Sequence, residues 1–239
     1  RALAAHCDID IDIQEIESET EALSVFGKRL PVFPVKLVTP VTYGKPDKAN
    51  SFAVQESIRQ AVSWVRAGDC AAVVTNPIHK AIMLQAGFKH PGHTEYLAEL
   101  AKIKTPPVMM LASPELRVVP LTIHMALRDV PAAITTENII TVATIILKEL
   151  TAKFGIAKPR LAVAGLNPHA GEDGALGDEE IKIIKPAVAQ LQKKGLGVVT
   201  GPHPADMMFN PEARAKLDCA LCMYHDPALI PIKMLDVWN

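Results

Sequence analysis

The sequence lacks a strong excess of charge of either sign. Its 25 Lys and Arg balance 26 Asp and Glu, which gives a formal net charge of −1 and a pI near 6.8. A nucleic-acid-binding domain usually carries a basic patch and a pI above about 9, so this balance argues against nucleic acid as a partner. With 239 residues, of which 49% are hydrophobic, the chain is typical of one large or two ordinary globular domains.

Long hydrophobic runs are also missing. The richest apolar stretch, residues 139–147, has about half the ~20 residues that a membrane helix needs, and Lys148 and Glu149 follow it. It indicates a buried helix. The chain does not open with the charged and then apolar segments of a signal peptide. We therefore expect no membrane partner and a cytoplasmic location.

Cysteine is scarce. Cys219 and Cys222 have the spacing of a redox pair or of half a zinc site, but no second pair completes four ligands. Both lie in an apolar run at 219–224 that indicates a buried strand, where cysteine behaves as a small hydrophobic residue. We predict structural, reduced cysteines.

Short apolar runs alternate with helical patterns along the chain. Strands are predicted at residues 33–38, 70–75, 117–123, 160–165, 197–200 and 219–224. Helices are predicted at residues 51–66, at 136–154, and from Asp178 to just before Gly195, with a kink at Pro186. Several of the strands are apolar without alternation, as strands covered on both faces should be. The pattern predicts an α/β fold with a largely parallel sheet and ligands at the carboxyl ends of its strands.

Three histidines each follow a predicted strand. His124 directly follows the strand at 117–123, His225 directly follows the one at 219–224, and His169 follows the one at 160–165 after a short turn. Three neutral imidazoles can hold a divalent transition metal and leave a position open for water or substrate. The alternative, that each ring only hydrogen-bonds within its own loop, stays open because the spacing carries no local motif.

Five further positions could serve the same chemistry. Asp206 and Asp226 could orient an imidazole or accept a proton, although each could equally cap a helix. Lys233 could meet a phosphate or carboxylate, or be a solvated surface residue. His93 and Thr94 follow a Pro-Gly turn at a helix start, which suits an anion but also an ordinary capping box.

Other common catalytic patterns are absent from the sequence. It has no Gly-x-Ser-x-Gly, and the glycines at 171, 174 and 177 match neither a dinucleotide fingerprint nor a P-loop. Nucleophilic hydrolase chemistry is therefore disfavoured.

Five segments in order along the chain resemble the 4-hydroxythreonine-4-phosphate dehydrogenases. They are TNPIHK at 75–80, PGHTE at 91–95, GLNPHAGE at 165–172, GPHPAD at 201–206, and MYHD at 223–226 continuing to Lys233. The resemblance implies a two-domain fold similar to isocitrate and isopropylmalate dehydrogenases. We expect residues 1–92 and 226–239 to form a first domain that is incomplete at both ends, and residues 93–225 to form a second domain with the dimer interface.

The resemblance also implies the ligands. A divalent metal, zinc first and Mg or Co as alternatives, is expected on His124, His169 and His225, in a site shared between the subunits of a homodimer. NAD is expected without a Gly-x-Gly-x-x-Gly motif, with NADP left open and the binding residues unidentified. His93, Thr94 and Lys233 are the expected substrate contacts.

The implied reaction is a metal-dependent oxidation of 4-phosphooxy-threonine by hydride transfer to NAD, in pyridoxal phosphate biosynthesis. The 3-oxo acid then decarboxylates to 3-amino-2-oxopropyl phosphate. Asp206 and Asp226 are the candidate catalytic residues. Two alternatives stay open: a dehydrogenase of another four-carbon hydroxy-acid phosphate, and a metal-dependent hydrolase with a three-histidine ion.

The sequence departs from the family pattern in places. Relatives begin with a segment like Gly-Asp-Pro-Ala-Gly-Ile-Gly-Pro-Glu and continue well past the lysine, and neither region is present here. We expect either a fragment of a longer protein or a sequence from which residues have been omitted. Such a chain could bind metal and dimerise without turnover. Pro227 and His79 stand where relatives usually have Gln and Asn, which leaves the predicted metal ligands intact and weakens the prediction of the substrate.

Overall fold

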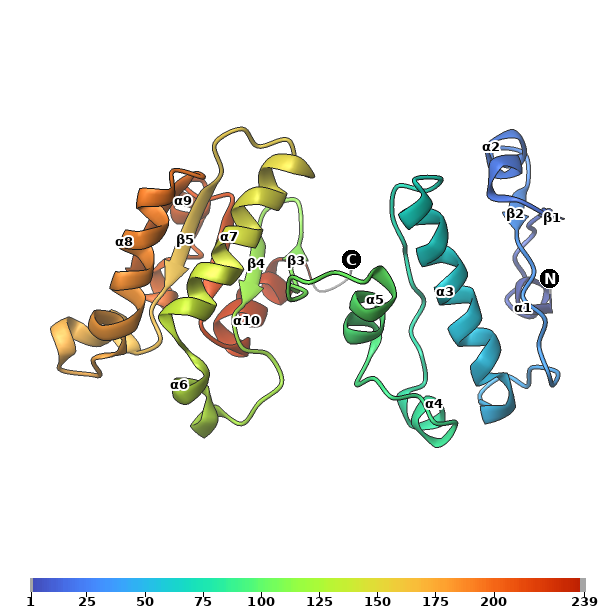
Figure 1. The fold of residues 1–239 in the computed structure, drawn as a ribbon, viewed down its shortest axis with the longest axis horizontal. Coiled ribbons are helices and arrows are strands. Elements are labelled where there is room, and N and C mark those ends of the chain that lie inside the picture. The colour runs from blue at the N-terminus through green and yellow to red at the C-terminus, as the bar shows by residue number, and fades with distance from the viewer. Residues whose placement is uncertain (1, 237–239) are drawn as a thin grey trace. The chain divides into compact units, whose positions relative to one another are not determined.

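The chain forms two compact units, Arg1–Pro107 and Val108–Asn239, in a computed structural model that describes residues 2–236. Figure 1 labels the helices and strands of each unit. Both contain helices and strands, and the larger sheet is mostly parallel. The predicted mixed α/β class is confirmed.

The second unit is built on a five-stranded sheet with the order β3-β4-β7-β5-β6. All neighbouring strands are parallel except β3 and β4, which pair antiparallel. The strands are β3 (Leu111–Ala112), β4 (Arg117–Pro120), β5 (Arg160–Ala164), β6 (Val198–His203) and β7 (Cys219–Cys222). Four predicted strands are thus confirmed, and β7, the last in sequence, lies at the centre of the sheet.

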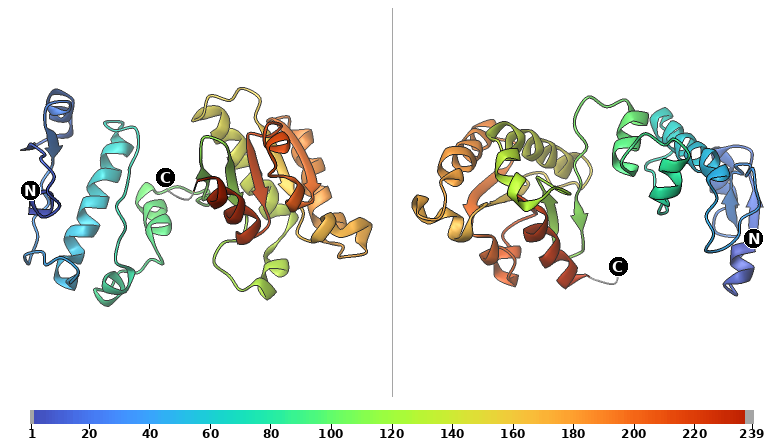
Figure 2. Two further views of the ribbon diagram at one scale, coloured as in Figure 1. Left: turned by 180° about the vertical axis from the view of Figure 1, so that it is seen from behind. Right: turned by 90° about the horizontal axis from the view of Figure 1, so that it is seen from below.

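Helices cover both faces of this sheet (Figure 2). Alternate residues of each strand point to opposite faces, so Val119 and Leu221 pack with one set of helices while Val118 and Ala220 pack with the other. The first set is α7 (Thr136–Ala152) and α8 (Lys185–Lys194), and α10 (His225–Leu235) covers the second face. Two shorter helices complete the unit, α6 (Val130–Ala133) and α9 (Pro211–Arg214).

The predicted helix around Pro186 forms in two parts. A π-helical turn at Glu180–Ile184 leads into α8, and Pro186 lies in the first turn of α8. Proline has no backbone N–H to donate to a carbonyl of the preceding turn. The change in hydrogen-bond pattern before Pro186 therefore leaves no N–H of that residue without an acceptor. Gly195 ends α8 in the left-handed conformation, as predicted.

The first unit is mainly helical. Its helices are α1 (Ala2–His6), α2 (Ala22–Val25), α3 (Ser51–Ala67), α4 (Lys80–Gln85) and α5 (His93–Ala101). A small core of Ile58, Val62, Met83, Phe88 and Tyr96 joins the last three of them. The short strands β1 (Ile13–Glu15) and β2 (Leu30–Val32) pair in parallel.

Two predicted strands of the first unit were wrong. Residues 33–38 follow β2 without strand structure, and residues 70–75 are irregular and join no sheet. Residues 71–75 make no backbone hydrogen bond to another part of the described chain, and Val74 is 96% exposed. A strand exists through its ladder of backbone hydrogen bonds, so an apolar sequence alone does not form one.

The unit boundary differs from the predicted domain boundary. Contacts within the chain divide it between residues 107 and 108. The sequence predicted the division between residues 92 and 93, and it assigned residues 226–239 to the first domain. Helix α10 packs on β4 and β7, so its residues lie with the second unit. The end of that predicted segment, 237–239, lies outside the described residues, and the complete domain boundaries stay a prediction.

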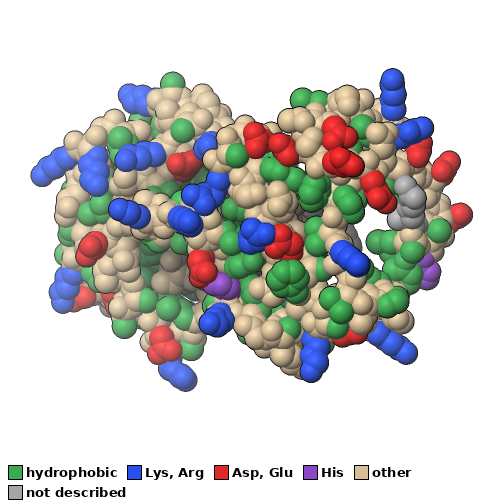
Figure 3. Space-filling view, turned by 45° about the vertical axis from the view of Figure 1, so that its right-hand side comes forward, with side chains coloured by type: hydrophobic (Ala, Val, Ile, Leu, Met, Phe, Trp, Pro, Cys, Tyr) green, Lys and Arg blue, Asp and Glu red, His purple; other side chains and the backbone are tan. Residues whose placement is uncertain are grey.

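Taken singly, none of the helices within residues 2–236 has the length and hydropathy to cross a membrane. Two consecutive helical segments meet the criteria of length and hydropathy when they are taken together, and the chain bends by 86° between them. They are Leu127–Ala133 and Thr136–Ala152. Figure 3 shows one face of the molecule, on which charged side chains of both signs are interspersed with hydrophobic ones, in keeping with the near-zero net charge.

Candidate functional site at the carboxyl edge of the second sheet

The strand order gathers four histidine-bearing segments at one edge of the second sheet. Strands β4, β7, β5 and β6 are parallel neighbours, so their carboxyl ends meet at the same edge. His124, His225 and His169 follow the first three of these strands, and His203 is the last residue of the fourth. Because ligands of open α/β sheets bind outside the carboxyl ends of strands, this edge is the candidate site.

The rings of His124 and His225 lie close together. Their centroids are 6.1 Å apart. The pairing of β4 with β7 continues past the strands, because Leu121 N donates to Cys222 O and the Thr122 hydroxyl donates to Met223 O, both at 2.8 Å. These bonds hold the two segments side by side up to the histidines.

His225 is oriented by its neighbour. Nδ1 of His225 lies 2.7 Å from Oδ1 of Asp226, and His225 is the first residue of α10. A carboxylate on Nδ1 favours the tautomer with the proton there and leaves Nε2 as a lone-pair donor. Asp226 thus contacts the imidazole of His225 and does not cap the helix with its side chain, while its catalytic role stays a prediction.

A cavity opens beside this pair. It measures about 390 Å³, and it is lined by His124, Leu127, Val130, Tyr224, His225 and Asp226, among others. A space of this size accepts a small-molecule ligand. The carboxyl edge therefore combines two imidazoles, a carboxylate and room for a substrate.

His169 lies in a strained segment, here named the His169 turn (Pro168–Gly174). Five successive residues, His169, Ala170, Gly171, Glu172 and Asp173, have φ between 43° and 80°. Left-handed backbone costs about 1–2 kcal/mol per non-glycine residue, so four such residues cost roughly 4–8 kcal/mol. Strain of this kind persists only where the surroundings impose it, and it is concentrated at functional sites.

Glycine makes the His169 turn possible. An alanine Cβ at Gly171 would fall 2.6 Å from Oε2 of Glu180, and one at Gly177 would fall 2.3 Å from Nδ2 of Asn167. Both glycines also have positive φ, 80° and 132°. Gly171 and Gly177, which belong to no phosphate-binding motif, thus allow backbone and side chains to pack closely.

The three histidines do not all meet in the structure. Among residues 2–236, no group of three or more His, Cys, Asp or Glu is arranged to hold a metal ion. His124 and His225 are brought together, whereas His169 lies after the adjacent strand β5. The three-ligand set stays a prediction.

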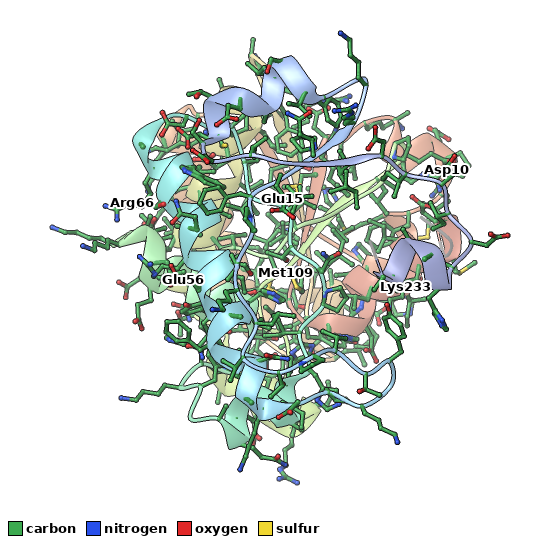
Figure 4. The ribbon with its side chains drawn as sticks, turned by 90° about the vertical axis from the view of Figure 1, so that its right-hand side faces the viewer. Asp10, Glu15, Glu56, Arg66, Met109 and Lys233 are labelled. Carbon is green, nitrogen blue, oxygen red and sulfur yellow. The ribbon has the colours of Figure 1, made fainter. Side chains whose placement is uncertain are left out.

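Two other predicted site residues, Asp206 and Lys233, are both exposed. Asp206 is exposed on a short turn after β6. Lys233 is exposed on α10 (Figure 4), eight residues after His225, which places it roughly 12 Å along the helix at 1.5 Å per residue.

His203 belongs to the segment GPHPAD at 201–206, but the sequence did not predict it as a site residue. It ends β6, its ring nitrogen Nε2 lies 2.9 Å from Thr200 Oγ1, and burial lowers its pKa. A neutral ring is therefore favoured at physiological pH. Its place at the end of a parallel strand is the signal that could have identified it.

His93 and Thr94 start α5 in the first unit. Gly92 is the N-cap and makes no side-chain cap, so Thr94 lies within the first helical turn instead of capping it. Nε2 of His93 is buried and has no hydrogen-bond partner among the described residues. Lys80 was not predicted from the sequence; its Nζ and Oε2 of Glu95 both lie 3.7 Å from the position of a Cβ on Gly92. A cation beside a helix N-terminus favours an anionic ligand.

The cysteine pair is buried in β7. Cys219 and Cys222 are free and fully buried. Burial raises the pKa of Cys222 to about 12 and raises that of Cys219 further. Thiols in this state are inert, which confirms the structural interpretation.

The chain is similar to known proteins along its whole length. The family described as pyridoxal phosphate biosynthetic protein PdxA matches residues 1–239. Two curated relatives carry the name 4-hydroxythreonine-4-phosphate dehydrogenase. The one from Bradyrhizobium diazoefficiens is 54% identical over 219 residues, covering 90% of this chain and 63% of the relative, and the one from Caulobacter vibrioides is 48% identical over 234 residues, covering 96% and 70%.

A solved structure agrees with these relatives. The crystal structure of 4-hydroxythreonine-4-phosphate dehydrogenase from Klebsiella pneumoniae matches with a TM-score of 0.90 at 34% identity, covering 99% of this chain and 72% of that one. This chain thus spans roughly two thirds of the length of the proteins it matches. On the family match and these identities, the chain belongs to the PdxA family of pyridoxal phosphate biosynthetic proteins.

Proposed function

We propose that this chain provides the metal-binding part of a 4-hydroxythreonine-4-phosphate dehydrogenase. The proposed reaction is the NAD-linked oxidation of 4-phosphooxy-threonine to the 3-oxo acid, which decarboxylates to 3-amino-2-oxopropyl phosphate. The observation that carries the proposal is the pair of rings, His124 and His225, beside a cavity at the carboxyl edge of the sheet. The family match supports the substrate class.

The residues at this edge suit a divalent transition metal. Two imidazoles on one tetrahedral zinc, with Zn–N near 2.0–2.1 Å, have ring centroids about 5 Å apart, so the rings of His124 and His225, 6.1 Å apart, would have to approach by about 1 Å to share an ion. Asp226 on Nδ1 of His225 is the partner that metal-binding histidines commonly have. We propose His169, on the adjacent strand, as the third ligand, with zinc first and Mg or Co as alternatives.

The bound groups would supply Lewis acidity from the cation and hydride acceptance from the nicotinamide. The chain's own residues would do the positioning. Asp226 holds the proton at Nδ1 of His225 and fixes the ring. Asp206, exposed after β6, is our candidate to accept the proton of the substrate hydroxyl.

Cationic and helix-terminal groups would bind the charged ends of the substrate. We propose His93 and Thr94, at the start of α5, for a phosphate or carboxylate group, and add Lys80 because its ammonium group lies beside Gly92. Lys233 is the other proposed substrate contact. Oriented binding of this kind lowers the barrier by holding the reacting carbon near the acceptor.

The remaining features of the proposal concern the whole protein. We propose a homodimer whose site is shared between subunits, and NAD in preference to NADP. The free, buried cysteines fit a reducing compartment, so we place the protein in the cytoplasm.

An activity assay with controlled metal content tests the proposal. The chain is stripped of metal, supplied with 4-phosphooxy-threonine and NAD, and followed by NADH absorbance with and without zinc. We expect turnover that depends on zinc. Release of phosphate without any need for NAD would replace the proposal with a hydrolase, and turnover with another four-carbon hydroxy-acid phosphate alone would change the substrate.

Metal binding is measured in the same samples, because this chain spans only part of its relatives. Zinc binding without NAD reduction would limit the proposal for this chain to its metal site. The absence of both zinc binding and turnover would contradict the proposal.

A further inference from the structure

Glu180 is the only charged side chain that is buried among the described residues, with 1% of its surface exposed. Glutamate is almost never fully buried unless its charge is compensated. No salt bridge to Glu180 is found within residues 2–236; it is held by N–H donors instead. A buried carboxylate without a cation needs a structural reason.

The donors come from the segment that leads from β5 into the His169 turn. Oε1 of Glu180 accepts from the backbone N–H of Leu166 at 2.7 Å and of Asn167 at 2.8 Å. Oε2 accepts from Nδ2 of Asn167 at 3.0 Å. The second hydrogen of that amide goes to Oε2 of Glu179 at 2.7 Å. Three donors on one carboxylate are charge-assisted bonds of the stronger kind.

The backbone also leaves space for this carboxylate. A Cβ at Gly165 would lie 3.0 Å from Oε1 of Glu180, and a Cβ at Gly171 would lie 2.6 Å from Oε2. These two glycines lie on either side of His169 in sequence. The turn therefore closes around Glu180, and the side chain and the left-handed backbone fit each other.

The position of Glu180 depends on the widened helix before Pro186. Glu180 is the first residue of the π-helical turn that precedes α8. Insertions of this kind in a helix are frequent at functional sites. Ile184, at the end of the same turn, is anchored in the core against the sheet, so Glu180 has a rigid base.

We propose that Glu180 is a positioning residue, which imposes the left-handed conformation of the His169 turn and so fixes where the imidazole of His169 lies. It touches neither substrate nor metal in this account. The effect on a metal ion rests on the proposed function, whereas the effect on the turn does not.

The test uses three variants in the 239-residue chain. E180A removes the carboxylate and leaves the N–H groups of Leu166 and Asn167 without an acceptor. E180Q keeps one oxygen for these N–H groups and turns an N–H toward Asn167 Nδ2. The matched control is D218N, because Asp218 also accepts a backbone N–H and a side-chain N–H, from Arg160 at the opposite end of β5.

Amide hydrogen exchange reports on the turn. We expect the amides of Leu166 and Asn167 to lose more protection in E180A than its loss of global stability explains, to keep part of it in E180Q, and in D218N to lose no more than the loss of global stability explains. The ring resonances of His169 should shift in both Glu180 variants. Unchanged protection in E180A, or equal loss in D218N, would overturn the proposal. Should E180A not fold, E180Q and N167A carry the same comparison.

Zinc titration reports on the site. Loss of a residue that orients a metal ligand typically lowers affinity about 10–100-fold, and we expect this in E180A, less in E180Q, and none in D218N. Equal zinc affinity in E180A and wild type, despite lost amide protection, would show that Glu180 does not position a ligand. If wild type binds no zinc, the proposed metal site fails, and the amide data still decide the role of Glu180 in the turn.

Discussion

The two ends of strand β5 are each held by a carboxylate, but in different ways. At the amino end, Asp218 forms a salt bridge with Arg160 at 2.8 Å and accepts the backbone N–H of the same residue at 2.8 Å. At the carboxyl end, Glu180 is buried without a cation and binds backbone and amide N–H groups of a left-handed segment. The first arrangement stabilises regular structure, whereas the second maintains strained structure.

This difference separates stability from function within one sheet. The amino end has ordinary backbone and a partly exposed ion pair. The carboxyl end is followed by five left-handed residues, at the edge of the sheet that also carries the cavity beside His124 and His225. Strain that costs several kcal/mol is retained where it positions a side chain. Changes at the two ends should therefore affect different measurements.

The largest effect is expected from removing a proposed ligand. His169→Ala should lower zinc affinity by more than about 100-fold, because loss of an outer partner alone costs about 10–100-fold. The exposed ring contributes little to packing, so the melting temperature without metal should stay near that of wild type. Calorimetric zinc titration and thermal unfolding measure the two quantities. Wild-type zinc affinity in this variant would show that His169 is not a ligand. The carboxyl end of β5 would then no longer differ from the amino end by a role in metal binding.

A glycine substitution in the His169 turn should come next. Gly171→Ala adds a Cβ 2.6 Å from Glu180, whereas the matched control Gly195→Ala has positive φ but open space around its Cβ. The control should lose about 1–2 kcal/mol from the left-handed backbone alone. Gly171→Ala should lose a further ~1–3 kcal/mol from overpacking. Denaturant unfolding measures both, and equal losses would mean that the carboxylate is not closely enclosed.

Asp218→Asn should lower the free energy of unfolding by about 1.5–3 kcal/mol, the range for hydrogen bonds to charged groups. The hydrogen bond from Arg160 lowers the pKa of Asp218. A lowered folded pKa means that this stabilisation is present above the ordinary carboxyl pKa near 3.9 and is lost as pH falls through the folded value. Unfolding measured from pH 7 to pH 3 should therefore show a smaller acid loss in the variant. Zinc affinity that fell with it would contradict the separation of the two ends.

The smallest effect is expected at His203. Burial lowers its folded pKa, so the unfolded state takes up a proton first as pH falls below about 6.5. Stability should therefore be complete above this pH and decrease below it. His203→Asn should flatten the stability profile between pH 7 and pH 5. An unchanged slope would show that the ring is not desolvated in solution.

The sequence predicted the second unit better than the first. The strands that became β4, β5, β6 and β7 are apolar runs whose partners lie within the same unit. The runs at 33–38 and 70–75 looked alike in sequence but have no ladder in the described chain. Strand formation depends on partners, and composition alone does not supply them.

The site was predictable only in part. The parallel strands followed by His124 and His225 were the signal for this edge, and the two rings lie near each other there, while their role as metal ligands stays a prediction. The role of Glu180 was not visible, since acids at 178–180 also suit an ordinary helix N-terminus. The left-handed run was not visible either, because four of its five residues are not glycine.

The most direct test is a zinc-loaded crystal of this chain, with anomalous scattering recorded at the zinc edge. One strong peak is expected at the carboxyl edge, with ring nitrogens of His124, His169 and His225 at about 2.0–2.1 Å. A peak elsewhere, or one that the ring of His169 does not reach, would contradict the account.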